Sequence, residues 1–157
     1  MFVVELKTRQ LPRLGSDELA DLPGQGRRVL LLYKAGCPTC RIALPLLEQL
    51  YRRGEGIIDI VAVSQDSLEE TEDFVRDNKI TMPVYLDNPG WPLSTELGLA
   101  SVPVLLQLDG ELLGSTIEGF SREEYRRAME LMVSAAGLEW DCAYLFDNPE
   151  LPDFKPG

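Results

Sequence analysis

Two cysteines separated by two residues, Cys37 and Cys40, lie where an apolar run gives way to a helical pattern. Residues 29–33 are continuously apolar, as in a buried strand, and residues 38–53 carry a broad apolar face with helical spacing. The first turn of a helix has free N–H groups and the positive end of the dipole, and both stabilise a thiolate. A thiolate is the nucleophile of thiol–disulfide exchange. The pair therefore constrains the chain to a strand–helix unit built around a dithiol.

Three interpretations of this pair compete: a redox dithiol, half of a zinc site, and two small core residues. Zinc takes about four Cys or His ligands, whereas this chain has no histidine and only one further cysteine, Cys142. A core role suits a lone cysteine better than a pair at a strand–helix junction. The pattern favours the redox dithiol, and we expect no metal and no other cofactor.

Charge and composition narrow the class of protein. The chain has 157 residues and a formal net charge of −11, which argues against nucleic acid and anionic membranes as partners. No apolar run has the length of a membrane span, the start shows no signal-peptide pattern, and three cysteines do not make a secreted disulfide framework. We therefore expect a cytoplasmic protein, although a secreted or periplasmic chain whose leader had been removed would look the same.

The residues after the dithiol alternate between strand and helix patterns. The sequence predicts strands over 57–63, 82–87, 104–108 and 111–118, and helices over 67–78, 93–97 and 121–136. Ser67 and Ser121 each stand three residues before a glutamate and predict capping boxes. Asp109-Gly110 predicts a tight hairpin turn.

The whole chain, 1–157, is expected to form one domain. Residues 1–28 are interpreted as a lead-in that covers a sheet edge, with a strand within 1–8 and a short helix near 16–20. Residues 29–136 form the core. Residues 137–157 have no regular period but are rich in aromatic side chains, so we expect a tail that packs on the body.

The order of these elements resembles the thioredoxin fold. Pro45, five residues after the second cysteine, matches the proline that kinks the helix in that family, Val102-Pro103 matches its cis-proline loop, and Gly119 matches the glycine before its last helix. The resemblance implies an α/β fold of three α/β/α layers with a mixed central sheet. The helix–strand unit of residues 67–87, inserted before the cis-proline loop, resembles the TlpA-like and AhpC/TSA-like branch.

The resemblance also implies roles for individual residues. Cys37 would be the exposed nucleophile, and Cys40, more buried, would resolve the mixed disulfide. Pro38 and Thr39 lie between them and would contact substrate. Val102-Pro103 would be a cis peptide whose loop offers the backbone of the valine to an extended substrate segment.

The chain departs from the family at several positions. Leu31 stands where thioredoxins carry a buried aspartate, Ala43 where many TlpA-like proteins carry an acid, and Gly36 where a tryptophan is usual. The group that accepts the proton of the second cysteine is therefore unassigned. Lys34 and Arg41 flank the pair, either as cations that stabilise a thiolate or as ordinary solvated charges.

The sequence thus predicts a thiol–disulfide oxidoreductase, acting as a reductase on a disulfide-bearing protein or a small thiol substrate. An upstream thiol reductant would recharge it, and we expect a monomer. One alternative is a peroxiredoxin-like thiol peroxidase with Cys37 as the peroxidatic cysteine, although Lys34 stands where the Pro-x-x-x-Thr-x-x-Cys pattern requires threonine. The other is a thioredoxin-fold binding module without redox activity.

Overall fold

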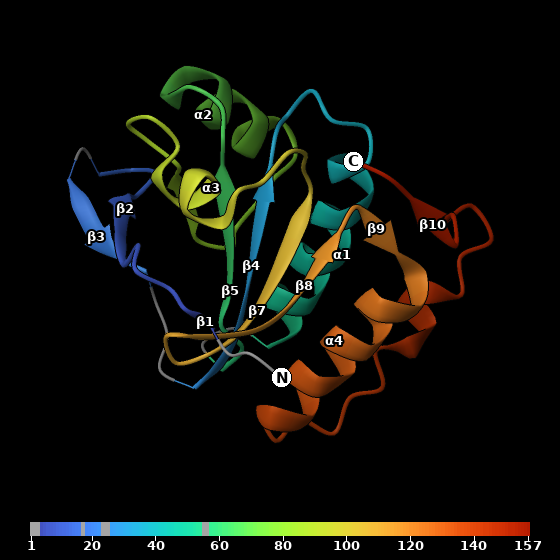
Figure 1. Cartoon of the computed structure of the whole chain (residues 1–157). Helices are drawn as coiled ribbons and strands as arrows, with labels where there is room; N and C mark the ends of the chain where they lie inside the picture. Colours follow the sequence, from blue (N-terminus) through green and yellow to red (C-terminus); the bar gives the residue numbers. More distant parts are fainter. Residues whose placement is uncertain (1–3, 17, 23–25, 55–56) are drawn as a thin grey trace.

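A computed structural model describes residues 4–16, 18–22, 26–54 and 57–157. Within them, six strands form a mixed sheet in the order β1-β8-β7-β4-β5-β6 (Figure 1). The central strand β4 pairs in parallel with β5 and antiparallel with β7, and β5 pairs in parallel with β6. The bounds of the six strands are β1 Val4–Glu5, β4 Arg27–Tyr33, β5 Ile60–Ser64, β6 Val84–Leu86, β7 Val104–Asp109 and β8 Leu112–Glu118.

Helices cover both faces of this sheet. They are α1 Cys40–Arg53, α2 Leu68–Asp77, α3 Pro92–Leu97 and α4 Arg122–Ala135. In Figure 1, α1 and α4 lie on one side of the sheet and α3 on the other. Helix α2 lies beside α1, where the guanidinium of Arg41 stands 5.4 Å from the ring centre of Phe74. The predicted thioredoxin-like α/β/α fold with an inserted helix–strand unit, α2 and β6, is confirmed. None of the helices in the described part of the chain has the length and apolar character needed to cross a bilayer.

The core forms because the central strands are covered on both faces. Residues 29–33 of β4 are each at most 2% exposed, and all five residues of β5 are buried. Strands buried on both sides are continuously apolar rather than alternating, which is the pattern that the sequence shows. Leu31 is one of these core residues, so an apolar side chain at this position agrees with its surroundings.

Several predicted boundaries differ from the structure by one to three residues, and two of these differences have clear local reasons. Helix α1 begins at Cys40 and not at Pro38, because residues 38 and 39 form a turn before the regular helix. Strand β5 begins at Ile60 and not at residue 57. The N–H groups of Ile57 and Ile58 both bond back to the carbonyl of Gly54 at 2.9 Å, so these residues are held near the C-cap of α1 and not in the strand.

The short helix expected near residues 16–20 is not formed by the described residues there. Leu19–Asp21 is instead strand β3, which pairs antiparallel with β2, Gln10–Pro12. Residue 17 lies outside the described residues. A single helical turn is costly to nucleate and gains few hydrogen bonds, whereas the hairpin pairs three residues on each strand.

This hairpin continues onto the sheet edge, as expected of the lead-in. Arg13 forms a bridge with Tyr85 of the edge strand β6, and the N–H of Leu14 bonds to the carbonyl of Val84 at 2.9 Å. At the opposite edge β1 pairs with β8. The N-terminal residues therefore contact both edges of the sheet.

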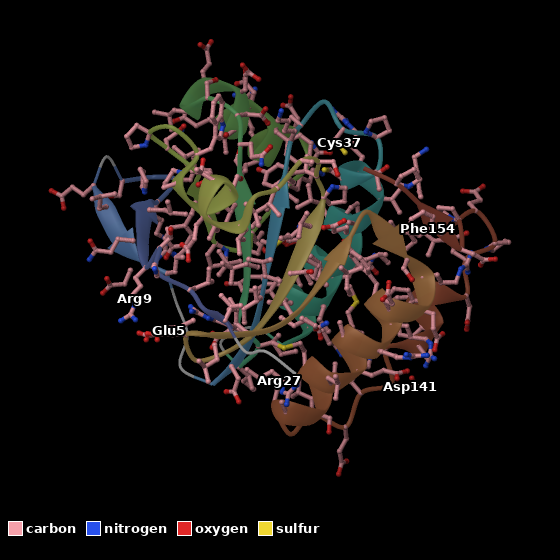
Figure 2. All side chains as sticks on the ribbon, viewed as in Figure 1. Glu5, Arg9, Arg27, Cys37, Asp141 and Phe154 are labelled. Atoms are coloured by element: carbon pink, nitrogen blue, oxygen red, sulfur yellow. The ribbon has the colours of Figure 1, made fainter. Side chains whose placement is uncertain are left out.

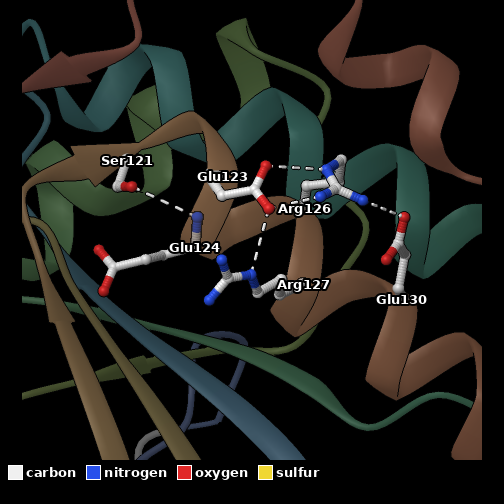
Figure 3. Close-up of polar contacts among 6 residues, drawn as sticks. All are labelled: Ser121, Glu123, Glu124, Arg126, Arg127 and Glu130. Carbon is white, nitrogen blue, oxygen red and sulfur yellow. Dashed lines mark hydrogen bonds and ion pairs between the residues drawn. The ribbon is translucent and has the colours of Figure 1, made fainter.

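Helix α4 begins with the predicted cap. Ser121 accepts a hydrogen bond on its hydroxyl oxygen from the N–H of Glu124 at 3.3 Å, and Ser67 does the same for Glu70 at 3.2 Å in α2. Side-chain ion pairs follow along the exposed face of α4, as Figure 3 shows: Glu123 with Arg126 and Arg127, and Arg126 with Glu130.

The tail after α4 packs back onto the body. It contains a short 3-10 helix, Ala143–Phe146, and strand β10, Phe154–Lys155, which pairs with β9, Phe120–Ser121. Arg122 holds this segment, because its guanidinium donates hydrogen bonds to carbonyls of the tail and its own N–H bonds to the carbonyl of Asp153 at 2.9 Å. The chain therefore ends beside the start of α1 (Figure 1).

Candidate active site

The dithiol lies where β4 ends and α1 begins, at the end of the sheet where Figure 2 labels Cys37. All three cysteines are free thiols, and Cys37 is half-buried whereas Cys40 is 0% exposed. The sulfur of Cys37 accepts a hydrogen bond from the N–H of Cys40 at 3.2 Å. This is the interaction expected of a sulfur that precedes a helix, whose first N–H groups lack intrahelical partners.

The loop before β7 meets the same sulfur from the opposite side. The Cys37 thiol donates a hydrogen bond to the carbonyl oxygen of Val102 at 3.4 Å, and the peptide bond between Val102 and Pro103 is cis. Residues 65 positions apart in sequence are thereby brought into contact. The dithiol and the loop matched to the family's cis-proline loop form one site.

The second thiol is held in its neutral form. Burial, the largest cause, raises the pKa of Cys40 far above its ordinary value, and the hydrogen bond with Cys37 and the charge of Asp66 raise this pKa further. A backbone hydrogen bond from Lys34 acts in the opposite direction. The two cysteines therefore differ in exposure and in surroundings, as nucleophile and resolving thiol would.

Asp66 is a feature of the site that the sequence analysis did not identify. Its carboxylate accepts a hydrogen bond from the N–H of Ala35 at 2.7 Å, and its charge contributes to the raised pKa values of Cys40 and Tyr33. Leu31 and Ala43, the two positions where the resemblance led us to look for an acid, are both 0% exposed. The acid near the dithiol thus comes from the end of β5.

A sequence signal for Asp66 existed. Strands β4 and β5 are parallel with Tyr33 opposite Ser64, so the residues that follow both strands emerge at the same edge. Asp66 follows β5 by two residues, as Ala35 follows β4. An acid just after the second parallel strand is therefore placed beside the loop that carries Cys37.

The two cations that flank the dithiol have different environments. Arg41 donates from its Nε to the carbonyl of Ala35 at 2.9 Å and stacks on Phe74, so its guanidinium is engaged by groups other than the thiols. Lys34 is exposed, and its carbonyl accepts the N–H of Cys37 at 3.2 Å.

The residues expected to bind substrate gather around the dithiol, but most of them are covered. Pro38 is exposed, whereas Thr39 is 2% and Val102 7% exposed, and Pro103 is also buried. The hydroxyl of Thr39 donates a hydrogen bond to the carbonyl of Pro156, in the tail, at 2.7 Å. Thr39 is therefore not open to substrate in this conformation.

An open groove of about 560 Å³ lies next to the cis-proline loop. It runs between Lys34 at the dithiol, Val102, and helix α3 with the turn before it. Trp91, 53% exposed, forms part of its wall and donates from its Nε1 to the carbonyl of Gln65 at 3.0 Å. The groove ends at Val102, whose carbonyl contacts the Cys37 thiol.

Elsewhere, the third cysteine lies in the tail. Cys142 is 1% exposed, and burial raises its pKa. These properties are those of a packed, unreactive thiol. Among the described residues there is no group of three or more His, Cys, Asp or Glu side chains that could hold a metal ion.

Comparison with known proteins gives a family and several relatives. The model of the AhpC/TSA family matches residues 6–108, more than half of the chain. The sporulation thiol-disulfide oxidoreductase A of Bacillus subtilis is 27% identical over 117 residues, which are 69% of this chain and 70% of that protein.

Solved structures share the fold. The crystal structure of StoA from Bacillus subtilis is similar with a TM-score of 0.62 at 22% identity and covers 81% of this chain and 96% of its own. A putative thiol:disulfide interchange protein DsbE from Chlorobium tepidum has a TM-score of 0.68 at 18% identity and covers 81% and 91%. A secreted Mycobacterium tuberculosis disulfide oxidoreductase has a TM-score of 0.63 at 17% identity and covers 78% and 94%.

The names and folds of these relatives agree with the class of enzyme and the fold predicted from the sequence. The predicted class of enzyme, a thiol–disulfide oxidoreductase with a thioredoxin-like fold, is confirmed by them. Together with the family match over residues 6–108, this shows that the chain belongs to the AhpC/TSA family.

Proposed function

We propose that this protein is a dithiol reductase in which Cys37 attacks a substrate disulfide and Cys40 resolves the mixed disulfide that forms. The observation that supports this most directly is the asymmetry of the pair. The Cys37 sulfur is partly accessible and accepts the N–H of Cys40 at 3.2 Å, whereas the Cys40 side chain is fully buried. Only the first sulfur is placed to meet a substrate.

The reaction follows from ordinary thiol–disulfide exchange. The Cys37 thiolate forms a bond to one sulfur of the substrate, the substrate S–S bond breaks, and the other substrate sulfur leaves as a thiolate that takes up a proton. Cys40 then loses its proton and attacks the Cys37 sulfur, which releases the first substrate sulfur as a thiol. Two electrons pass to the substrate, and an upstream thiol reductant restores the dithiol.

Single replacements of the two cysteines test this division of roles. Cys37→Ser should abolish attack on a protein disulfide. Cys40→Ser should leave attack intact and stop resolution, so that substrate accumulates as a covalent adduct on Cys37. Non-reducing gels of both variants with insulin as substrate provide the measurement. An adduct on Cys37→Ser and none on Cys40→Ser would exchange the two roles, and no adduct on either would remove the main support for the proposal.

A peroxidase assay separates this proposal from the peroxiredoxin-like alternative. In that alternative Cys37 reacts with a peroxide. Lys34 occupies the position of the threonine of the peroxidatic pattern, has no hydroxyl group, and accepts the N–H of Cys37 on its backbone carbonyl. We therefore expect slow consumption of hydrogen peroxide with dithiothreitol as donor and faster reduction of insulin. A Cys37 thiol inert in both assays would favour the binding module.

The expected direction of electron flow depends on the compartment in which the protein works. A cytoplasmic dithiol normally donates electrons, which is the basis for proposing a reductase. Two of the structurally similar proteins are described as secreted, from Mycobacterium tuberculosis and Corynebacterium glutamicum. They support the alternative location outside the cytoplasm. The Cys37–Cys40 redox potential distinguishes a reductase from an oxidant. We expect a value near the roughly −270 mV of thioredoxin, and a value near −120 mV would make the protein an oxidant.

A further inference from the structure

The last residues of the chain lie on the surface that an extended substrate segment would use. The carbonyl of Pro156 accepts the Thr39 hydroxyl at 2.7 Å. Gly157 lies against the cis-proline loop so closely that a Cβ on this residue would overlap the carbonyl oxygen of Val102. This is the same oxygen that accepts the Cys37 thiol. The tail and the reactive sulfur therefore meet at one backbone group.

The contact between the tail and the body continues away from the dithiol, along Gly119 and strand β9. Gly119 faces the tail so closely that a Cβ there would lie 2.7 Å from the carbonyl of Lys155 and 3.1 Å from the Cα of Pro156. Strand β10 pairs antiparallel with β9, which places Lys155 opposite Phe120. Residues 154–157 thus run as an extended segment along β9, past Gly119, to Val102 and Thr39.

The strongest polar contacts of this segment lie just before it, at Asp153. Arg122 anchors the preceding residues through Asp153, with a backbone hydrogen bond of 2.9 Å and an ion pair of 3.2 Å. Beyond that anchor, Phe154 is 63% exposed, and Pro156 and Gly157 are also exposed. Few apolar contacts hold the end of the tail, and such segments open locally at low cost in free energy.

The groove of about 560 Å³ leaves a second approach to the site. Its described lining comes from Lys34, Val102 and the region of helix α3, and includes no residue of the tail. A small disulfide can therefore approach from the groove side while the tail stays in place. An extended polypeptide that pairs with the backbone of Val102 cannot, because residues 156–157 already occupy that position.

We propose that residues 154–157 act as a built-in competitor of extended disulfide substrates, so that this tail sets the preference of the enzyme between polypeptide and small disulfides. The proposal rests on the proposed function of the dithiol, and names what limits its substrates. Polypeptides react only after the tail has left the strip formed by Gly119, Val102 and Thr39. Their apparent affinity is the intrinsic affinity multiplied by the fraction of molecules in which the tail is displaced.

The test compares two disulfides on three forms of the protein. One form lacks residues 154–157 but keeps Asp153 and its contacts with Arg122. The second carries Gly157→Ala, whose methyl group would overlap the carbonyl of Val102. The third carries Glu150→Ala, an exposed position in the tail that leaves residues 154–157 intact, and is the matched control.

We expect the truncated form to reduce insulin about three to ten times faster than the intact protein, the effect of losing a competitor worth about one net hydrogen bond. Gly157→Ala should act in the same direction, and Glu150→Ala should not. Reduction of 5,5′-dithiobis(2-nitrobenzoic acid) should change less than about twofold in all forms. Equal changes for both substrates, or an unchanged or slower insulin reaction after truncation, would overturn the proposal.

Hydrogen exchange separates failure of this proposal from failure of the redox function. The Cys37→Ser, Cys40→Ser double variant has no dithiol, and the amides of Phe154, Lys155 and Gly157 should still be protected in it. An insulin B-chain peptide with serine in place of cysteine should increase their exchange. If the tail exchanges at the rate of an unstructured peptide, or if the peptide leaves it unchanged, the competitor role is wrong even where insulin is reduced. Forms that reduce neither disulfide would instead contradict the redox function.

Discussion

The environment of Cys40 combines complete burial with a nearby carboxylate. Burial and the charge of Asp66 both raise the pKa of this thiol, and resolution requires its thiolate. The release of the second thionitrobenzoate in the reaction with 5,5′-dithiobis(2-nitrobenzoic acid) measures resolution. Its rate should rise about tenfold per pH unit from pH 7 to 9 without a plateau, because the thiolate fraction grows in that proportion below the pKa.

Replacement of Asp66 tests the contribution of its charge. Asp66→Asn keeps an oxygen that can accept the N–H of Ala35 but removes the negative charge, so the pKa of Cys40 should fall and the second phase should become faster at every pH in that range. Asp73→Asn, an exposed acid paired with Arg76 on α2, serves as the control and should leave the rate unchanged. A slower second phase in Asp66→Asn would mean that the carboxylate assists proton removal instead.

At the scale of elements, the helices depend on their first turns. Ser121 satisfies the N–H of Glu124 at the start of α4 and also lies in β9, beside the tail. Ser121→Ala should lower the free energy of unfolding by about 1 kcal/mol, the usual cost of losing such a cap. Urea denaturation measures this as a lower midpoint with an unchanged slope. Ser134→Ala, near the exposed end of the same helix, should cause no loss, and an equal loss in both variants would contradict the capping role.

At the scale of the whole molecule, two buried tyrosine hydroxyls and a buried thiol keep their protons. Burial is the largest cause that raises the pKa values of Tyr33, Tyr125 and Cys40, whose ordinary values are 10.0, 10.0 and 9.0. Above pH 10 the unfolded chain releases these protons and the folded chain retains them. The stability that these three groups contribute is therefore fully present below their ordinary pKa values and is lost as the pH rises above them.

Each such group contributes a slope of about 1.4 kcal/mol per pH unit, or up to about 4 kcal/mol per unit for the three together. The urea midpoint should therefore be constant from pH 7 to 8.5 and fall steeply above pH 10. Tyr125→Phe should remove about one third of this slope. A midpoint that stays constant up to pH 11 would show that these groups ionise in the folded protein.

The features that the sequence determined are those built by neighbouring residues. The dithiol at a strand–helix junction, the caps at Ser67 and Ser121, and the hairpin after Asp109 depend on spacing and on backbone preferences within a few residues. Each of them could therefore be predicted from the local sequence alone. The errors near residues 16–20 and 57–59 have the opposite origin, because pairing with a partner strand and bonding to Gly54 overrode a weak local pattern.

Only the tertiary structure decided what surrounds the dithiol. The carboxylate that acts on Cys40 comes from Asp66, at the end of another strand, and the segment that covers Thr39 comes from Pro156, 117 positions away. Composition and periodicity describe single elements and carry no information about which distant loops meet at the end of a sheet. The order of strands and the path of the tail along β9 set these contacts, so the position of the two cysteines at a strand–helix junction followed from the sequence while their surroundings followed from the fold.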